Sequence, residues 1–254
     1  MALSVKIMPC LDMQNGQVVK GVRFVDIKNA GDPVECAQAY CNAGADELAL
    51  LDITATVEGR KTMLDVVSRV AEVTTVPFTV GGGISSVATA ADVLEAGANR
   101  ISTSSAAFRT PDVIREMVDA FGGDRVTVAI DAAQNKAFPS GYEVYIDGGR
   151  TATGVDAVEW AKTVDGYGVG TILPTSKSTD GVREGYDLPL ISKIKQISSA
   201  VVVASGGAGT LEHFYEAAQA GASVLLAASV FHFNVIGIQE VKNYLRDKGV
   251  AVLP

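Results

Sequence analysis

The sequence has 254 residues, of which 48% are hydrophobic, and its formal net charge is −8. This length suits one large α/β barrel or two small domains, and the apolar content is ample for a core. The acidic balance argues against a general nucleic-acid surface, which would be basic. The three cysteines (Cys10, Cys36 and Cys41) form no C-x-x-C pair, and the two histidines are isolated. We therefore expect reduced thiols and neither a metal nor another cofactor. Without a signal-peptide pattern or an apolar run near 20 residues, the expectation is a soluble, cytoplasmic protein with no membrane contact.

Short apolar runs alternate with amphipathic stretches along the chain. The predicted strands are Val5–Leu11, Glu47–Asp52, Phe78–Val80, Arg100–Thr103, Val126–Ile130, Thr171–Leu173, Val201–Ala204 and Val224–Ala227. The predicted helices lie near residues 34–43, 61–73, 86–96, 111–121, 155–166, 188–197, 210–220 and 237–247. Eight strand–helix units of this spacing predict one α/β domain over residues 1–254, a closed parallel (β/α)8 TIM barrel. Within the polar stretch 132–149, the run Tyr142–Ile146 is compatible with a small hairpin.

A signature of glycine and small residues occurs twice, 124 residues apart. At this offset Gly81–Gly83 aligns with Ser205–Gly207, Ala96–Ala98 with Ala220–Ala222, and Ser104–Ser105 with Ala228–Ser229. Repeated matches at one offset indicate two similar half-barrels. Glycine after a strand lets backbone N–H groups approach a ligand closely, as phosphate sites require. We therefore predict two phosphate sites, the alternative being tight turns that only close the barrel. We name Gly81–Gly83 with Ser104–Ser105 the first glycine–serine site, and Ser205–Gly207 with Ala228–Ser229 the second.

In a barrel of this kind, functional groups lie at the carboxyl ends of the strands and in the loops that follow. Asp12 follows the first predicted strand and Asp131 the fifth, and these strands face each other in an eight-stranded ring. Two opposed carboxylates can divide general acid and base work if their surroundings raise the pKa of one. A capping or loop role is the alternative for each. Lys20, in the long loop after the first strand, could close over an anionic substrate or remain a solvated lysine. The loop after the sixth strand carries Asp180-Gly181, which we assign to the second glycine–serine site.

Several segments together resemble one enzyme family: PCLDMQNGQVVKGVRF (9–24), GDPVE (31–35), GADELALLDITAT (44–56), FTVGGGI (78–84), VAID (128–131), DGVREGYD (180–187), ASGGAGTLEHF (204–214) and LAASVFHF (226–233). This wording closely resembles the cyclase subunit of imidazole glycerol phosphate synthase, from histidine biosynthesis. The sister isomerase of that pathway shares the half-barrel plan and the two aspartates, but lacks the CLD, LDITA and ASVFHF segments.

The resemblance implies a lyase-type cyclase that forms a heterodimer with a HisH-type glutaminase. Ammonia from the glutaminase, delivered through the barrel, attacks a ribulosyl-type bisphosphate (PRFAR), and the products are imidazole glycerol phosphate and an aminoimidazole carboxamide ribotide (AICAR). It also implies that Asp12 and Asp131 are the acid–base pair and that Lys20 belongs to a closing loop. The implied phosphate ligands are Gly83, Ser104 and Ser105 at one end and Asp180, Gly181, Gly207, Ala228 and Ser229 at the other.

The chain also departs from the family pattern. At the implied ammonia gate, Lys6, Glu47 and Arg100 keep their charges, but Thr171 replaces the usual Glu. One acid against two bases leaves unbalanced positive charge, so we expect a looser gate. The other departures are Ser104 in place of Asn, Lys177-Ser178-Thr179 in place of a segment with an acid and a base, and Asn99 in place of an acid linked to partner activation.

Two alternatives remain at this stage. One is the sister isomerase activity on a similar bisphosphate. The other is a barrel without catalysis, which serves as a docking platform or a phosphate sensor. The retention of both Asp12 and Asp131 argues against the second, because a binding protein does not need the pair.

Overall fold

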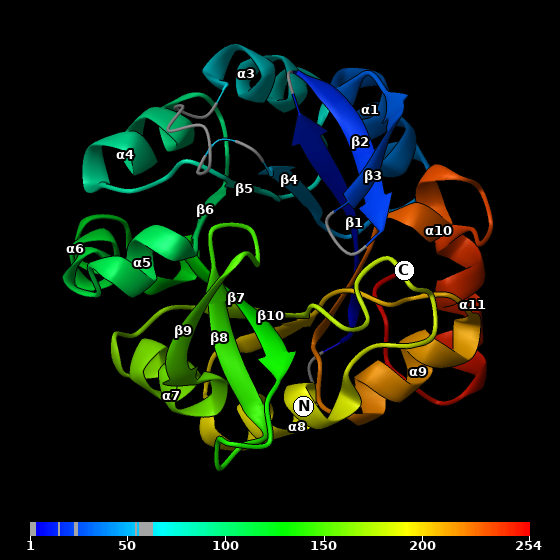
Figure 1. Ribbon diagram of the computed structural model, residues 1–254. Helices are drawn as coiled ribbons and strands as arrows, with labels where there is room; N and C mark the ends of the chain where they lie inside the picture. The colour runs from blue at the N-terminus through cyan, green and yellow to red at the C-terminus, as the bar shows by residue number, and fades with distance from the viewer. Residues whose placement is uncertain (1–3, 15, 23–24, 54, 56–62) are drawn as a thin grey trace.

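A closed parallel barrel of eight strands forms the centre of the molecule (Figure 1). The computed structural model describes all residues except 1–3, 15, 23–24, 54 and 56–62, and describes only the backbone of 20–22 and 25–30. The barrel strands are β1 (Lys6–Gln14), β4 (Leu48–Asp52), β5 (Phe78–Gly81), β6 (Arg100–Thr103), β7 (Val126–Gln134), β10 (Thr171–Ser176), β11 (Val201–Ala204) and β12 (Val224–Ala227). Parallel pairing of β12 with β1 and of β10 with β7 completes the ring. The predicted (β/α)8 fold and its eight strands are therefore confirmed.

Helices surround the barrel in Figure 1. The longer ones are α1 (Pro33–Asn42), α3 (Leu64–Val73), α4 (Val87–Glu95), α6 (Asp112–Phe121), α7 (Ala157–Gly166), α8 (Leu188–Ile197), α9 (Leu211–Gln219) and α11 (Ile238–Asp247). Each buries its apolar stripe against the strands, as α3 does with Val66, Val67 and Val70. The predicted start of α3, at residues 61–62, lies outside the described residues. The short helices α5 (Ser105–Arg109), α10 (Ser229–His232) and η1 (Gly123–Arg125) were not predicted.

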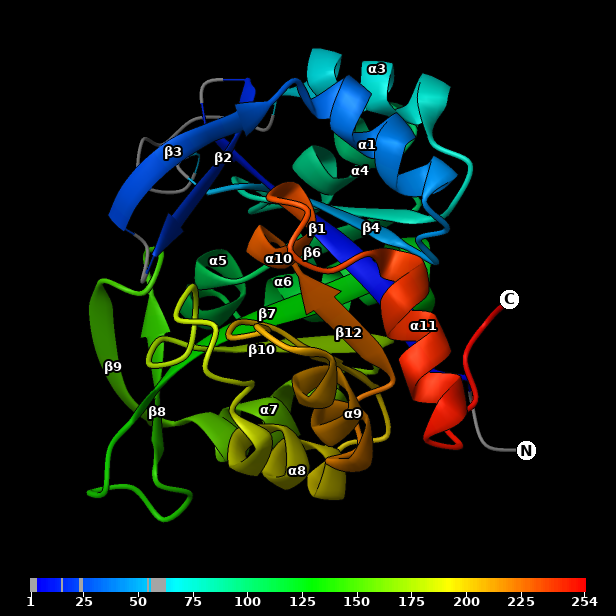
Figure 2. The ribbon, with the colours of Figure 1, turned by 90° about the vertical axis from the view of Figure 1, so that its right-hand side faces the viewer.

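Two antiparallel hairpins extend the carboxyl end of the barrel. The hairpin of β2 (Gln17–Val22) and β3 (Val25–Gly31) pairs with β1, and that of β8 (Tyr142–Ile146) and β9 (Thr151–Asp156) pairs with β7. This pairing carries β1 and β7 beyond their predicted ends, so that Asp12 and Asp131 lie within strands. It also makes residues 151–156 a strand, which is why α7 begins later than predicted. Lys20 was expected in an open loop and instead lies on β2 opposite Lys28. In Figure 2 both hairpins lie at one end of the barrel, and the start of β1 and the C-terminal residues lie at the other.

The 124-residue repeat is visible in the structure. The bounds of α4 and β6 recur 124 residues later as those of α9 and β12, and α5 and α10 begin at equivalent residues. The N-caps also match, since the Ser86 side chain accepts from Thr89 N and the Thr210 side chain from His213 N. The prediction of two half-barrels of similar plan is confirmed in these elements.

Apolar side chains fill the barrel interior between its two ends. This inner cluster is separate from the core between strands and helices, and consists of Met8, Cys10, Ala49, Leu173, Val203, Val224, Leu226 and Ala228.

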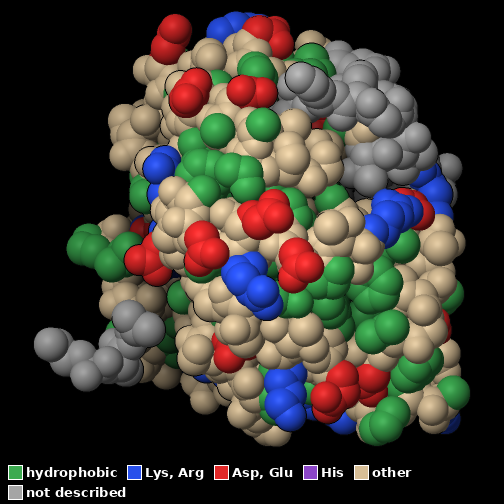
Figure 3. Space-filling model, turned by 90° about the vertical axis from the view of Figure 1, so that its left-hand side faces the viewer, with side chains coloured by type: hydrophobic (Ala, Val, Ile, Leu, Met, Phe, Trp, Pro, Cys, Tyr) green, Lys and Arg blue, Asp and Glu red, His purple; other side chains and the backbone are tan. Residues whose placement is uncertain are grey.

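On the face drawn in Figure 3, acidic and basic side chains are interspersed among polar and apolar ones. Within the described part of the chain, none of the helices has the length and apolar character that crossing a bilayer requires.

Candidate active site

The carboxyl end of the barrel encloses a cavity of about 670 Å³, here called the upper cavity. Both opposed carboxylates, Asp12 and Asp131, line it. The other predicted site residues in its wall are Gly83, Ser104, Ser105, Asp180, Gly181, Gly207, Ala228 and Ser229. The structure thus brings together every residue predicted for the substrate site except Lys20, whose side chain lies outside the described atoms. Both glycine–serine sites open into one space.

The two carboxylates lie on β1 and β7. Asp12 accepts a hydrogen bond from Cys10 Sγ at 3.2 Å. The pKa of Asp131 is raised to about 7: burial is the largest cause, the negative charge of Asp180 adds to it, and the ammonium of Lys177 opposes both. A carboxyl group with such a pKa gains and loses a proton readily near neutral pH, which is the requirement for general acid–base catalysis.

The first glycine–serine site is built on a tightly constrained turn after β5. Gly82 has a φ of 99°, and a Cβ added there would lie 2.2 Å from the backbone oxygen of Asp52, so only glycine fits. Ser105 Oγ accepts from Asp147 N at 2.8 Å, which leaves its hydroxyl hydrogen available for an anion. Arg109 Nη2 lies 2.6 and 2.7 Å from the two carboxylate oxygens of Asp147. Both Arg109 and Arg150 line the upper cavity, and Arg109 ends the short helix that begins at Ser105 of this site.

The second glycine–serine site has the same construction after β11. Gly207 has a φ of 108°, and a Cβ there would meet the backbone oxygen of Gly185 at 2.0 Å. Thr179 Oγ1 donates to Gly206 O at 3.2 Å. Arg183 Nε donates to Ser229 Oγ at 3.2 Å, so a guanidinium group also stands beside this site. The arrangement suits anionic groups at two places in the cavity.

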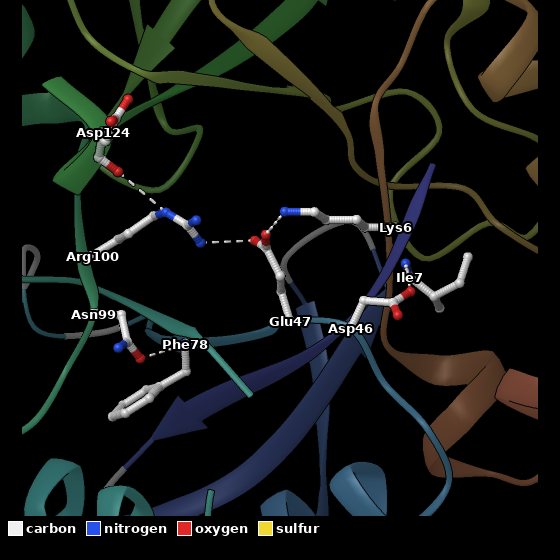
Figure 4. Close-up of polar contacts among 8 residues, drawn as sticks. All are labelled: Lys6, Ile7, Asp46, Glu47, Phe78, Asn99, Arg100 and Asp124. Atoms are coloured by element: carbon white, nitrogen blue, oxygen red, sulfur yellow. Dashed lines mark hydrogen bonds and ion pairs between the residues drawn. The ribbon is translucent and has the colours of Figure 1, made fainter. Parts of the chain in front are cut away.

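A smaller cavity of about 100 Å³ lies at the amino end of the barrel, here called the lower cavity. All four predicted gate residues, Lys6, Glu47, Arg100 and Thr171, line it. Glu47 bridges the two bases, since Lys6 Nζ lies 2.5 Å from Oε1 and Arg100 Nη1 lies 2.9 Å from Oε2 (Figure 4).

Two further contacts bear on the lower end of the barrel. Asn99 Oδ1 accepts from Phe78 N at 2.9 Å, which ties the start of β6 to that of β5. Leu51 and Leu173 line both the upper and the lower cavity. Only a thin apolar layer therefore separates the two cavities.

Sequence reasoning missed the basic residues of the upper end, namely Arg109, Arg150 and Arg183. Arg109 lies only four residues after Ser105, and a basic residue so close to a predicted phosphate site was an available signal. The other two lie in loops whose position depends on tertiary packing.

Comparison with known proteins identifies the family of this chain. A family model described as "Histidine biosynthesis protein" matches residues 6–237, so the chain belongs to the class of histidine biosynthesis proteins. The chain is 50% identical over 254 residues to the imidazole glycerol phosphate synthase subunit HisF of Pyrobaculum aerophilum, with 99% of each chain covered. It is 49% identical over 248 residues to the same subunit of Clostridium botulinum, covering 97% of this chain and 98% of that one. The chain therefore belongs to the HisF family of imidazole glycerol phosphate synthase subunits, and the resemblance found in the sequence is confirmed.

Proposed function

We propose that this protein is the cyclase subunit of imidazole glycerol phosphate synthase and converts PRFAR and ammonia to imidazole glycerol phosphate and AICAR in the cytoplasm. Full-length similarity to HisF subunits supports the reaction class. The observation that carries the proposal is a single cavity lined by two opposed carboxylates and two glycine–serine sites. Such a cavity suits a long substrate with a phosphate at each end.

The phosphates are bound at the ends of the cavity. Each glycine–serine site offers backbone N–H groups and a serine hydroxyl, and a guanidinium group stands near each serine. These fixed donors recognise anions without a large positive field, which fits the acidic overall charge. The reacting atoms at the middle of the substrate then lie between Asp12 and Asp131.

The chemistry is general acid–base catalysis by the carboxylate pair. Ammonia attack, ring closure and cleavage require that protons leave the attacking nitrogen and reach the departing group. Asp131, with a pKa of about 7, can do either near neutral pH. Asp12 serves the opposite side of the substrate.

Ammonia enters from the amino end of the barrel. A glutaminase subunit of the HisH type docks on that face, and ammonia passes the Lys6–Glu47–Arg100 group into the lower cavity. The remaining barrier is the apolar layer at Leu51 and Leu173, through which a small neutral molecule passes more readily than an ion.

The test is to incubate the purified protein with PRFAR and an ammonium salt and to follow the imidazole product. Turnover that disappears in Asp131→Asn supports the proposal. An aldose–ketose rearrangement of the isomerase substrate, without cyclisation, would assign the sister activity instead. Tight binding of the bisphosphate with no conversion would identify a phosphate sensor.

A further inference from the structure

A lysine in the turn directly after β10 is held over an aromatic ring of β8. Lys177 Nζ lies 3.8 Å from the centroid of the Tyr145 ring, a close cation–π contact. The aliphatic part of Lys177 packs beside Gly149, where an added Cβ would lie 3.4 Å from its Cδ and Cε. The main-chain N of Lys177 donates to Ala132 O at 2.9 Å. Side chain and backbone therefore fix this lysine against the β8–β9 hairpin and β7.

The strand register places this contact on the face that carries Asp131. Asp131 pairs with Tyr145 of β8 on one side and with Thr175 of β10 on the other. Directly paired residues point to the same face of a sheet, so the Tyr145 ring lies on the face of Asp131. Lys177 begins in the turn after β10, on one side of β7, and its ammonium reaches this ring on the β8 side. The contact with the ring therefore brings the ammonium to the face of β7 that carries Asp131.

The buried carboxylate of Asp187 links the strand that carries Tyr145 to the segment that carries Lys177. Asp187 Oδ1 accepts from Tyr142 Oη at 2.6 Å, and Asp187 Oδ2 accepts from Ser176 Oγ at 2.7 Å. Tyr142 belongs to the same strand as Tyr145, and Ser176 directly precedes Lys177. All three hydrogen-bonded residues are buried. These hydrogen bonds tie the strand that carries Tyr145 to the residue that precedes Lys177.

The charged groups around Asp131 indicate what the position of Lys177 does for this carboxyl group. From the loop after β10, Asp180 raises the pKa of Asp131, as does burial, whereas Lys177 lowers it. Asp12 of β1 lines the same cavity, as do Arg109 of α5 and Arg150 of the hairpin. The side chain of Lys20 lies outside the described atoms. Among the described cations, Lys177 is the one whose charge acts on the pKa of Asp131 and whose ammonium contacts the ring paired with Asp131.

We propose that Lys177 is a positioning residue for Asp131, and that its ammonium, held over Tyr145, favours the ionised carboxylate against burial and Asp180. The role in turnover rests on the proposed function, whereas the effect on Asp131 in the free protein does not. At the dielectric constant of water, unit charges roughly 7 Å apart change a pKa by about half a pH unit, and burial of Asp131 makes this the lower bound. Loss of the ammonium should therefore raise the pH at which Asp131 titrates by at least about that much.

The experiment is a ¹³C NMR titration of the aspartate carboxyl groups, with the Asp131 signal assigned from its absence in Asp131→Asn. Lys177→Met should raise the midpoint of Asp131 by at least about half a pH unit. Lys177→Arg keeps the charge and should leave the midpoint close to its original value. Tyr145→Leu, which removes the ring, should move it upward. Lys162→Met removes the same charge from the exposed outer face of α7 and should have no effect.

A parallel pH profile of ammonia-dependent turnover connects the titration to catalysis. The limb that reports Asp131 should move to higher pH in Lys177→Met, whether the carboxylate or the carboxylic acid is the active form. A folded Lys177→Met protein in which the Asp131 midpoint moves by less than about 0.2 pH unit would overturn the proposal. An NMR shift in a protein that never cyclises PRFAR would instead refute the proposed function and leave the electrostatic assignment standing.

Discussion

The buried ion pair between α11 and the start of β4 gives a sharp prediction about stability. The side chains of Lys242 and Asp46 are 1% and 5% exposed, and Lys242 Nζ lies 2.7 Å from Asp46 Oδ1. Lys242 Nζ also donates to Pro254 O at 3.1 Å, and Asp46 Oδ2 accepts from Ile7 N at 2.8 Å (Figure 4). The pair therefore joins the last helix, the C-terminal residue and the first strand.

The perturbation is Lys242→Met, which keeps most of the side-chain volume and removes the charge. Loss of one partner from a buried pair costs about 3–5 kcal/mol, because the other charge stays buried without compensation. In the variant, Ile7 N still donates a hydrogen bond to Asp46. We therefore expect a loss at the lower end of this range, about 3 kcal/mol in the free energy of unfolding. For a chain of this size that corresponds to a melting temperature lower by roughly 6–12 °C.

The assay is urea and thermal unfolding of the wild-type protein, Lys242→Met, and Lys242→Met combined with Asp46→Asn. Asparagine keeps an acceptor for Ile7 N but removes the charge, so the double variant should regain a large part of the lost stability. A single variant that loses less than about 1 kcal/mol, or a double variant no more stable than the single one, would refute the electrostatic reasoning.

Three further predictions concern activity. Asp12→Asn and Asp131→Asn should each lower ammonia-dependent cyclisation by at least about 10²-fold, and near-normal turnover would remove that residue from the chemistry. Arg109→Gln should weaken binding of the bisphosphate by about 10-fold, the value for one hydrogen bond to a charged group at a half-exposed site. Calorimetry measures this, and unchanged affinity would leave Arg109 as a partner of Asp147 only. Thr171→Glu should tighten the gate, so that less ammonia escapes per imidazole product when glutamine and the glutaminase are present. One-for-one coupling in the unmodified protein would contradict this.

The fold was largely predictable because each barrel strand is a short apolar run, and the repeat identifies equivalent runs in the two halves. The position of the two carboxylates, Asp12 and Asp131, was predictable as well, since residues at the carboxyl ends of barrel strands face one cavity. The full lengths of β1 and β7 were not, because they depend on antiparallel partners such as β8 that lie outside the barrel. In sequence the polar, glycine-rich surroundings of β8 and β9 gave only a weak strand signal.

The electrostatic detail of the site depended on tertiary structure. In sequence, Lys177 was only a departure from the family pattern. Its position over Tyr145 follows from the hairpin, and the raised pKa of Asp131 follows from burial. The gate shows the same limit, because the sequence indicated which charged residues are present but not that Glu47 contacts both bases.

The position of the chain termini has a practical consequence. Val5 and Val252 form a parallel bridge, and Val5 N donates to Ala251 O at 2.8 Å, so both ends of the chain meet at the base of the barrel, next to Lys6. Figure 2 shows them on the side opposite the two hairpins. An affinity tag or surface linker at either terminus will therefore emerge beside the lower cavity. Protein immobilised through such a tag or linker should keep its upper cavity open to the bulk solution. The same attachment should sterically hinder the binding of a large partner at the base of the barrel.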